Sequence, residues 1–111
     1  MTEEEIRAFQ AVLRARRAEV VLLSENAAEA RKPVALDQQS IGRLSRQDAL
    51  QQQAMAKAQD ARRATEIRRI DAALARIEGG DFGYCDECGE EISLARLNID
   101  PMATRCVGCA V

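Results

Sequence analysis

Two closely spaced cysteine pairs near the carboxyl-terminal end constrain this chain more than any other feature. The pairs are Cys85/Cys88 and Cys106/Cys109, each a C-x2-C motif, with 17 residues between them. This spacing is typical of a structural zinc site, in which four thiolates surround one ion and leave no open position for a substrate. The alternatives are two disulfides or four unrelated buried thiols, and the lack of any export pattern favours zinc. The sequence therefore predicts one structural Zn²⁺ held by these four cysteines.

The segment that carries the cysteines, residues 81–111, is predicted to be a small separate module. The expected elements are a turn or hairpin over 84–92, a short helix over 93–97, a turn at 100–101 and a last short element from 106. Gly89 and Gly108 are expected to adopt positive φ in the tight turns around the sulfurs, because glycine tolerates that conformation.

The composition excludes several classes of function. The 111 residues contain no histidine, so Ser-His-Asp and Cys-His catalysis are absent, and no Gly-rich phosphate loop is present. We therefore expect a protein that is not an enzyme. The net charge of −2 gives no basic face for sequence-specific DNA binding. No apolar run of about 20 residues and no signal peptide are visible, which predicts a cytoplasmic protein without a membrane segment.

A first long helix is predicted over residues 3–31. Thr2 can cap it, and three glutamates follow at the positive end of the helix dipole. Apolar residues recur in steps of three and four, which predicts a heptad seam. The seam residues are Ile6, Phe9, Leu13, Val20, Leu23 and Ala27. Arg16 interrupts this pattern, and we expect its long stem to lie past the partner helix with the charge in water.

A second long helix is predicted over residues 46–78, where Gly79-Gly80 stops it. Its second half has a clear apolar seam, made of Ile67, Ile70, Leu74 and Ile77. Its first half is rich in alanine, which predicts a close approach of the two helices there. Going backward, the seam meets Arg63 and Asp60, so we expect the register to shift near residues 61–64.

Pro33 separates the two helices, because the residue before a proline avoids the helical conformation. Together these features predict a mainly α fold: a long antiparallel two-helix coiled-coil hairpin, capped by a small four-cysteine zinc finger with a short helix. We expect the hairpin over 1–80, with its tip at about 33–48, and the finger over 81–111. The seam is expected to be satisfied within one chain, as in a monomer.

The residues around the cysteines also carry a resemblance. In order they are Asp81-Phe82-Gly83-Tyr84-Cys85, Cys88-Gly89, Ile92, Arg96-Leu97, Pro101, Cys106 and Cys109. This pattern resembles the zinc finger of the DksA/TraR family, and the preceding helices match that family in layout more than in residues. The resemblance implies a bacterial protein that binds RNA polymerase and regulates transcription initiation, as in the stringent response, without a promoter-specific DNA site. It also implies that the hairpin enters the secondary channel of the polymerase.

The resemblance further implies where partners are contacted. The candidate contacts at the coil tip are Asp37, Ser40, Arg43, Ser45, Arg46 and Asp48. The family tip usually carries two aspartates three residues apart, whereas Asp37 and Asp48 stand eleven apart. Candidates for contacts with the alarmone ppGpp or with polymerase are Arg69 and Arg96. Asp100 stands where basic residues are common, and only two residues follow Cys109, so a response to ppGpp is left open.

Two other functions are compatible with the sequence. One is a zinc ribbon that binds nucleic acid, which the small number of basic residues in the finger disfavours. The other is a scaffold that pairs with another coiled coil.

Overall fold

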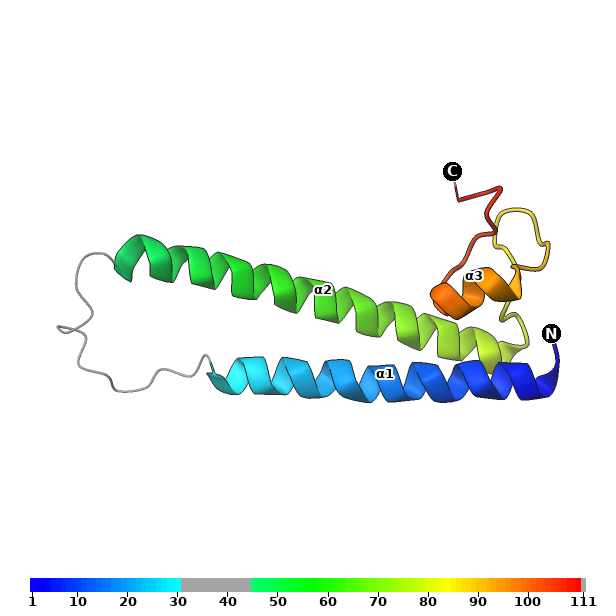
Figure 1. Cartoon of the computed structure of the whole chain (residues 1–111), viewed down its shortest axis with the longest axis horizontal. Helices are drawn as coiled ribbons and strands as arrows, with labels where there is room; N and C mark the ends of the chain where they lie inside the picture. Colours follow the sequence, from blue (N-terminus) through cyan, green and yellow to red (C-terminus); the bar gives the residue numbers. More distant parts are fainter. Residues whose placement is uncertain (31–44, 111) are drawn as a thin grey trace.

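The computed structural model describes residues 1–30 and 45–110. Two long helices, α1 (Glu3–Ala30) and α2 (Ser45–Gly79), lie side by side and antiparallel, and a short helix α3 (Leu94–Ile99) packs at one end (Figure 1). The molecule measures 61 × 28 × 20 Å along its principal axes. Within the described residues, the extended structure is limited to one isolated bridge between Tyr84 and Glu91. The predicted mainly α hairpin with a cysteine-bearing cap is confirmed.

The helix ends follow the capping signals of the sequence. At the start of α1, the Glu5 backbone N–H donates to Thr2 Oγ1 at 3.2 Å, and the Thr2 N–H donates to Glu5 Oε1 at 3.2 Å. This reciprocal pair is a capping box. At the end of α2, the Asp81 N–H donates to the Arg76 carbonyl at 2.9 Å. Gly80 has φ of +80° and closes a Schellman turn, in which its N–H donates to the Ile77 carbonyl at 3.3 Å.

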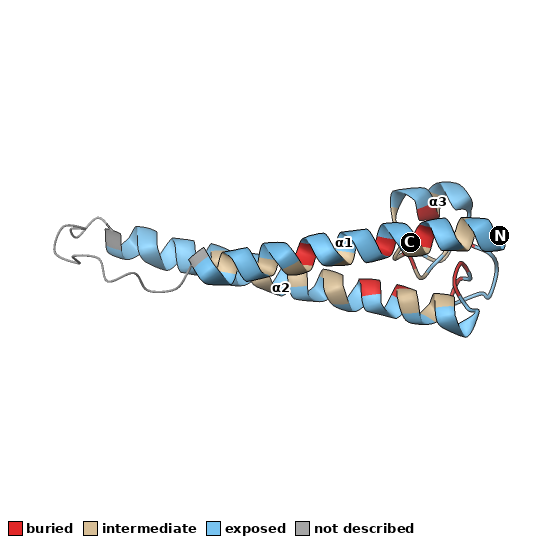
Figure 2. Ribbon diagram, turned by 90° about the horizontal axis from the view of Figure 1, so that it is seen from below, coloured by how far each residue is buried: buried red, intermediate tan, exposed pale blue. Residues whose placement is uncertain are grey.

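The hydrophobic core lies at the end of the hairpin where the finger sits (Figure 2). The rings of Phe9 from α1 and Phe82 from the finger lie 5.6 Å apart between centroids. The other buried members of this cluster are Leu13, Ile70, Ala73, Cys85, Ile92, Leu97 and Ala103. Two helices alone bury little apolar surface, so the finger completes the core at the base of the hairpin.

The apolar seam of α1 is shorter than the heptad pattern predicts. Val20 is 1% exposed, but Leu23 is 46% exposed, so the prediction of a buried Leu23 is wrong. Ser24 is half-buried instead, and its hydroxyl accepts a hydrogen bond from Arg63 of α2 at 3.2 Å. Arg63 in turn pairs with Asp60 at 2.6 Å. Because α2 presents charged groups at this level, it offers no apolar partner for Leu23.

The alanine-rich first half of α2 does not pack closely against α1, contrary to the sequence prediction. Its alanines are exposed at positions 49, 54, 58, 61 and 64, and only Ala56 is half-buried. With 35 residues against 28, α2 is the longer helix, and the two helices diverge toward the end away from the finger (Figure 1). Alanine buries too little apolar area to hold two helices together without larger neighbours.

Arg16 also differs from the prediction. Its guanidinium does not simply extend into water but forms a two-pronged ion pair with Glu66 of α2, at 2.8 Å for Nε–Oε2 and 2.9 Å for NH2–Oε1. The carboxylate on the facing helix matches the planar guanidinium and fixes its orientation.

Candidate metal centre

The first cysteine pair lies in a tight β-hairpin, as predicted. The Cys85 N–H donates to the Glu90 carbonyl at 2.8 Å, and the Gly89 N–H donates to the Cys85 carbonyl at 2.9 Å. Gly89 has φ of +75°, which confirms the conformation expected for it. The hairpin closes with the Ile92 N–H on the Gly83 carbonyl at 2.7 Å. This geometry turns both sulfurs toward the same side.

The second cysteine pair lies in a turn at the end of the described chain. The backbone N–H groups of Cys109 and Ala110 both donate to the Cys106 carbonyl, at 3.1 and 3.0 Å. Gly108 does not have positive φ, so that expectation is wrong; this turn closes in a conformation open to any residue. The Asp86 N–H donates to the Thr104 carbonyl at 2.9 Å and thereby ties the two turns together.

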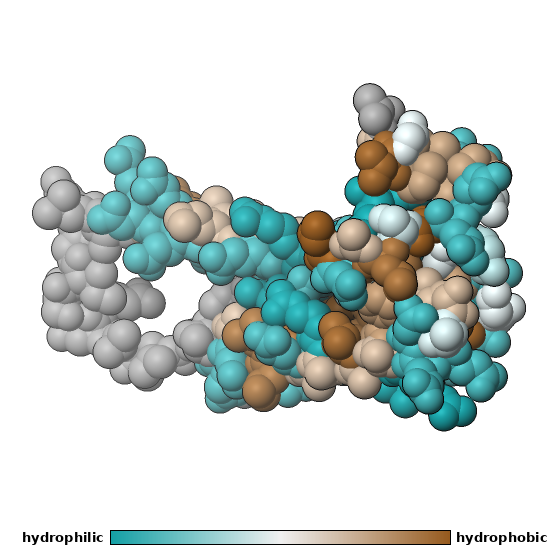
Figure 3. All heavy atoms as spheres, turned by 45° about the vertical axis from the view of Figure 1, so that its right-hand side comes forward, coloured by the Kyte–Doolittle hydropathy of each residue, from teal (hydrophilic) through white to brown (hydrophobic). Residues whose placement is uncertain are grey.

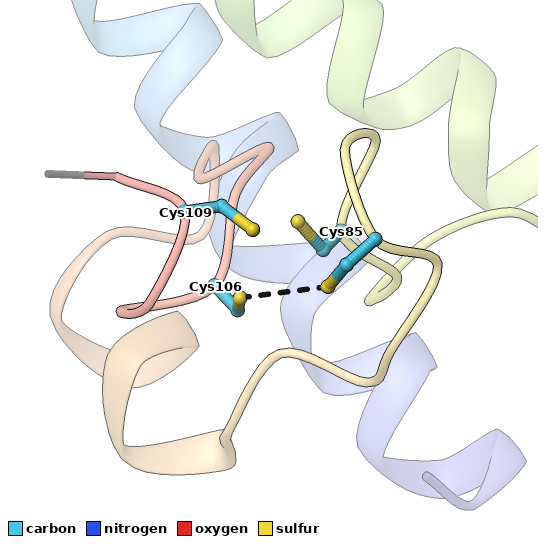
Figure 4. A group of neighbouring side chains, drawn as sticks. Cys85, Cys106 and Cys109 are labelled. Atoms are coloured by element: carbon cyan, nitrogen blue, oxygen red, sulfur yellow. Dashed lines mark hydrogen bonds between the residues drawn. The ribbon is translucent and has the colours of Figure 1, made fainter.

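The four sulfurs converge on one point between the two turns (Figure 4). All four Sγ atoms lie within 4.8 Å of one another, and Cys88 Sγ lies 3.7 Å from Cys106 Sγ. Four ligands at a Zn–S distance of about 2.3 Å form a tetrahedron with edges of about 3.8 Å, which matches this spacing. A disulfide would need sulfurs about 2 Å apart, and all four cysteines are free. The donor set thus fits one tetrahedral zinc ion and leaves no place for a substrate.

The thiols differ in how readily they ionise. Backbone N–H groups of Cys106 and Cys88 stabilise the Cys85 thiolate and lower the pKa of that thiol to about 6. The neighbouring sulfurs, first that of Cys106, raise the pKa of Cys109 to about 12, because thiolates repel one another. At Cys88 a backbone hydrogen bond from Glu90 lowers the pKa, but the adjacent sulfurs and burial outweigh it and raise the pKa overall. A divalent cation removes this repulsion, so metal binding and ionisation of the cluster are coupled.

A short helix and a set of polar contacts hold the finger on the hairpin. The α3 helix begins at Ser93, whose Oγ accepts from the Arg96 N–H at 3.2 Å, and it buries Leu97 completely. Arg96 Nε donates to the Arg105 carbonyl at 2.7 Å, next to the second cysteine pair. From α2, Arg69 NH2 lies 3.2 Å from Asp100 Oδ2. Both arginines that the sequence singled out for partner contacts are therefore engaged within the chain.

The described members of the predicted tip set lie at the start of α2, far along that helix from the sulfurs. Arg46 and Asp48 are exposed in the first turn of α2 (Figure 1). Ser45 begins that helix, and Asp37, Ser40 and Arg43 lie outside the described residues. The structure does not bring Ser45, Arg46 or Asp48 to the cysteine cluster.

The sequence prediction missed two cross-hairpin ion pairs. Besides Arg16–Glu66, Arg17 Nε lies 2.7 Å from Asp71 Oδ1, and Arg17 NH2 lies 3.4 Å from Asp71 Oδ2. Acidic residues next to the apolar seam of α2 were the signal that could have found them. None of the helices in residues 1–30 and 45–110 combines the length and apolar character needed to cross a membrane.

The fold and the site define a helical-hairpin protein with a structural four-cysteine zinc finger. Residues 80–111 match the family described as prokaryotic dksA/traR C4-type zinc finger. The structure is similar over 99% of this chain to that of the transcription factor DksA2 from Pseudomonas aeruginosa, with a TM-score of 0.78, 28% identity and 83% of that chain covered. The finger over residues 80–111 is thus of the dksA/traR C4 type, and its four-cysteine cluster fits one structural zinc ion.

Two curated relatives are similar over a shorter stretch of the chain. The chain is 56% identical over 41 residues to the RNA polymerase-binding transcription factor DksA of Caulobacter vibrioides, and 46% identical over 43 residues to that of Haemophilus influenzae. These matches cover 37% and 39% of this chain but only 29% and 30% of the relatives' length. A second solved structure, the RNA polymerase binding protein and transcriptional regulator Dks from Chlamydia trachomatis, is similar with a TM-score of 0.60 and 26% identity, covering 99% of this chain and 87% of that chain.

Proposed function

We propose that this chain binds bacterial RNA polymerase and regulates transcription initiation, with the helical hairpin entering the polymerase secondary channel. The observation that carries the proposal is the likeness along 99% of the chain to a solved DksA-type transcription factor. The curated relatives are named for binding RNA polymerase, which supports the same partner.

The dimensions of the hairpin suit a protein that reaches into a narrow channel. At about 1.5 Å per residue, the 35 residues of α2 extend about 52 Å. The arm of α2 is exposed throughout residues 46–55, and the face seen in Figure 3 is mostly hydrophilic there, whereas hydrophobic surface gathers where the finger meets the hairpin. We propose that the base and the finger supply docking affinity and that the arm carries the tip to its target.

The tip is proposed to act through its charged side chains. Asp37 and Asp48 are the candidates for the acidic residues through which the tip acts. Arg43 and Arg46 are candidates for contacts with phosphate or carboxylate groups. Ser40 and Ser45 can donate hydrogen bonds. We further propose that the chain acts as a monomer in the cytoplasm. We also propose that it is not an enzyme, because the one cluster of metal-ligating residues among those described offers four cysteines and no open position for a substrate.

We propose Arg69 and Arg96 as the candidates for contacts with ppGpp or with polymerase. Arg69 lies 3.2 Å from Asp100, whose negative charge competes with an anion for it. Arg96 is held by a backbone carbonyl rather than by a carboxylate, so its charge is still available to an anion. Asp100→Asn tests this point: if ppGpp binds the complex with polymerase at Arg69, the substitution should strengthen the response to ppGpp.

Transcription in vitro with purified polymerase tests the proposed role of the tip. Asp37→Asn, Arg43→Ala and Asp48→Asn should each leave zinc content and the melting curve unchanged, because the sequence predicts all three at the hairpin tip and the described Asp48 is exposed. Each should retain most of the binding to polymerase and abolish the effect on initiation at an rRNA-type promoter. If all three variants regulate such a promoter as well as the parent does, the tip is only a turn and the proposed mechanism is wrong.

A further inference from the structure

Two adjacent arginines of α1 each form a two-pronged ion pair with an acid of α2. Arg16 binds Glu66 with both contacts at or below 2.9 Å, and Arg17 binds Asp71 at 2.7 and 3.4 Å. The Glu66 side chain is only 25% exposed, so this pair is partly removed from water. Arg16 is also held on its own helix by Glu19, at 3.3 Å. Paired geometry of this kind fixes both distance and orientation.

The two ion pairs lie on opposite flanks of the contact between the helices. Glu66 and Asp71 are five residues apart on α2, which separates them by about 140° around the helix axis at about 100° per residue. The side chains between them that face α1 are Ile67 and Ile70, the latter fully buried. The pairs therefore bracket the apolar seam near the middle of the hairpin, where the seam is about to end.

Neighbouring registers of the two helices would lose both ion pairs. If α2 moved by one turn, the residues opposite Arg16 would come from positions three or four away from Glu66. Those positions are Arg62, Arg63, Arg69 and Ile70. The residues opposite Arg17 would likewise come from Ile67, Arg68, Leu74 and Ala75. Each slip places a like charge or an apolar residue opposite each arginine, so that the attraction is lost or becomes repulsion.

The apolar seam specifies the register only at the base. Beyond Val20 no further α1 residue whose burial is described is buried, and of the alanines in the first half of α2 only Ala56 is half-buried. The position of the arm relative to the finger is therefore set before that point, in the stretch between Leu13 and Val20 where Arg16 and Arg17 lie.

We propose that Arg16 and Arg17 are positioning residues that set the helix register, and so fix how far the hairpin arm projects from the zinc finger. This inference deepens the proposed function, since a tip that acts inside a channel must stand at a defined distance from the surface that docks.

Spin-label distances in the zinc-loaded chain test the register directly. Labels carried by a non-natural amino acid at Ala8 and Gln59, both exposed, leave the zinc cysteines untouched. Residue 8 lies near the finger end of α1 and residue 59 near the middle of α2. A slip along the helix axis therefore changes the distance between the two labels by nearly the length of the slip. One turn corresponds to about 5 Å. The parent protein should give one narrow distance distribution.

All variants lack the Arg16–Glu66 pair, and they differ in the charges at the Arg17–Asp71 pair. Arg16→Gln with Arg17→Asp has neither pair and should give a broad or shifted distribution. Adding Asp71→Arg to it restores one pair with reversed polarity and should return the parent distribution. Arg16→Gln with Arg14→Asp is the matched control, because exposed Arg14 makes no ion pair with the described residues, and it should keep the parent distribution.

The comparison decides the inference even if the variant without ion pairs is poorly folded. Recovery of the parent distribution by the reversed pair supports it. An unchanged distribution without either pair, or no recovery with the reversed pair, would overturn it. The measurement uses the free protein, so its outcome is independent of polymerase binding. If the protein proves not to bind polymerase, the register result still stands and the proposed function alone fails.

Discussion

The length of the apolar seam can be tested by one substitution made at two positions of α1. Leu13 and Leu23 both belong to the heptad pattern, but Leu13 is 2% exposed and Leu23 is 46% exposed. Replacing leucine by alanine removes three carbon atoms. At about 0.8 kcal/mol per buried carbon, the transfer contribution at Leu13 is about 2.4 kcal/mol, to which the cavity adds. Leu13 lies in the core cluster with Phe9 and Ile70, where packing from three elements limits collapse.

We therefore expect Leu13→Ala to lower the free energy of unfolding by about 3 kcal/mol and the melting temperature by more than about 10 °C. Leu23→Ala should cost less than about 1 kcal/mol, because nearly half of that side chain stays in water. Urea denaturation followed by circular dichroism measures both, with zinc present throughout. Equal costs at the two positions would refute the conclusion that the core ends near Val20.

The other predictions concern the metal. Removing zinc with a chelator should open the finger and expose Phe82, while most helical signal of α1 and α2 persists; circular dichroism and proteolysis of the finger measure this, and an unchanged finger without metal would contradict it. Cys88→Ser should have the same effect, with zinc content lowered from one ion per chain. Zinc affinity should fall as the pH falls, because Cys109 must release a proton to bind the ion. The affinity should fall more steeply below pH 6, because the Cys85 thiol, whose pKa is about 6, is then protonated as well. Competition with a chelating dye between pH 8 and 5.5 measures the slope, and a flat profile would contradict the thiolate site.

The elements that the sequence predicts well are those defined by local chemistry. The cysteine spacing, the Thr2 cap of α1 and the glycine stop after α2 each depend on a few neighbouring residues, and each was found as expected. The helix bounds agree within a residue or two for the same reason. These signals involve backbone groups that must be hydrogen-bonded wherever the helix ends.

The elements that the sequence did not predict depend on what the facing helix presents. A heptad pattern predicts that Leu23 is buried, but it cannot show that Arg63 and Ser24 occupy the interface at that level. Arg16 interrupts one seam without revealing its partner fifty residues away on the other helix. Gly108 was assigned a special conformation from its type alone, although its turn closes without one. Long-range pairing of this kind is not encoded in the periodicity of either helix.

Binding of the zinc-loaded chain to purified core RNA polymerase, in the absence of DNA, tests the central proposal most directly. The account predicts a saturable one-to-one complex that persists when the tip carries Asp48→Asn and is lost when the finger is opened by a chelator. Absence of binding to core polymerase would contradict it. A salt-sensitive shift of plain duplex DNA would then indicate a nucleic-acid-binding zinc ribbon, and concentration-dependent self-association would indicate a coiled-coil scaffold.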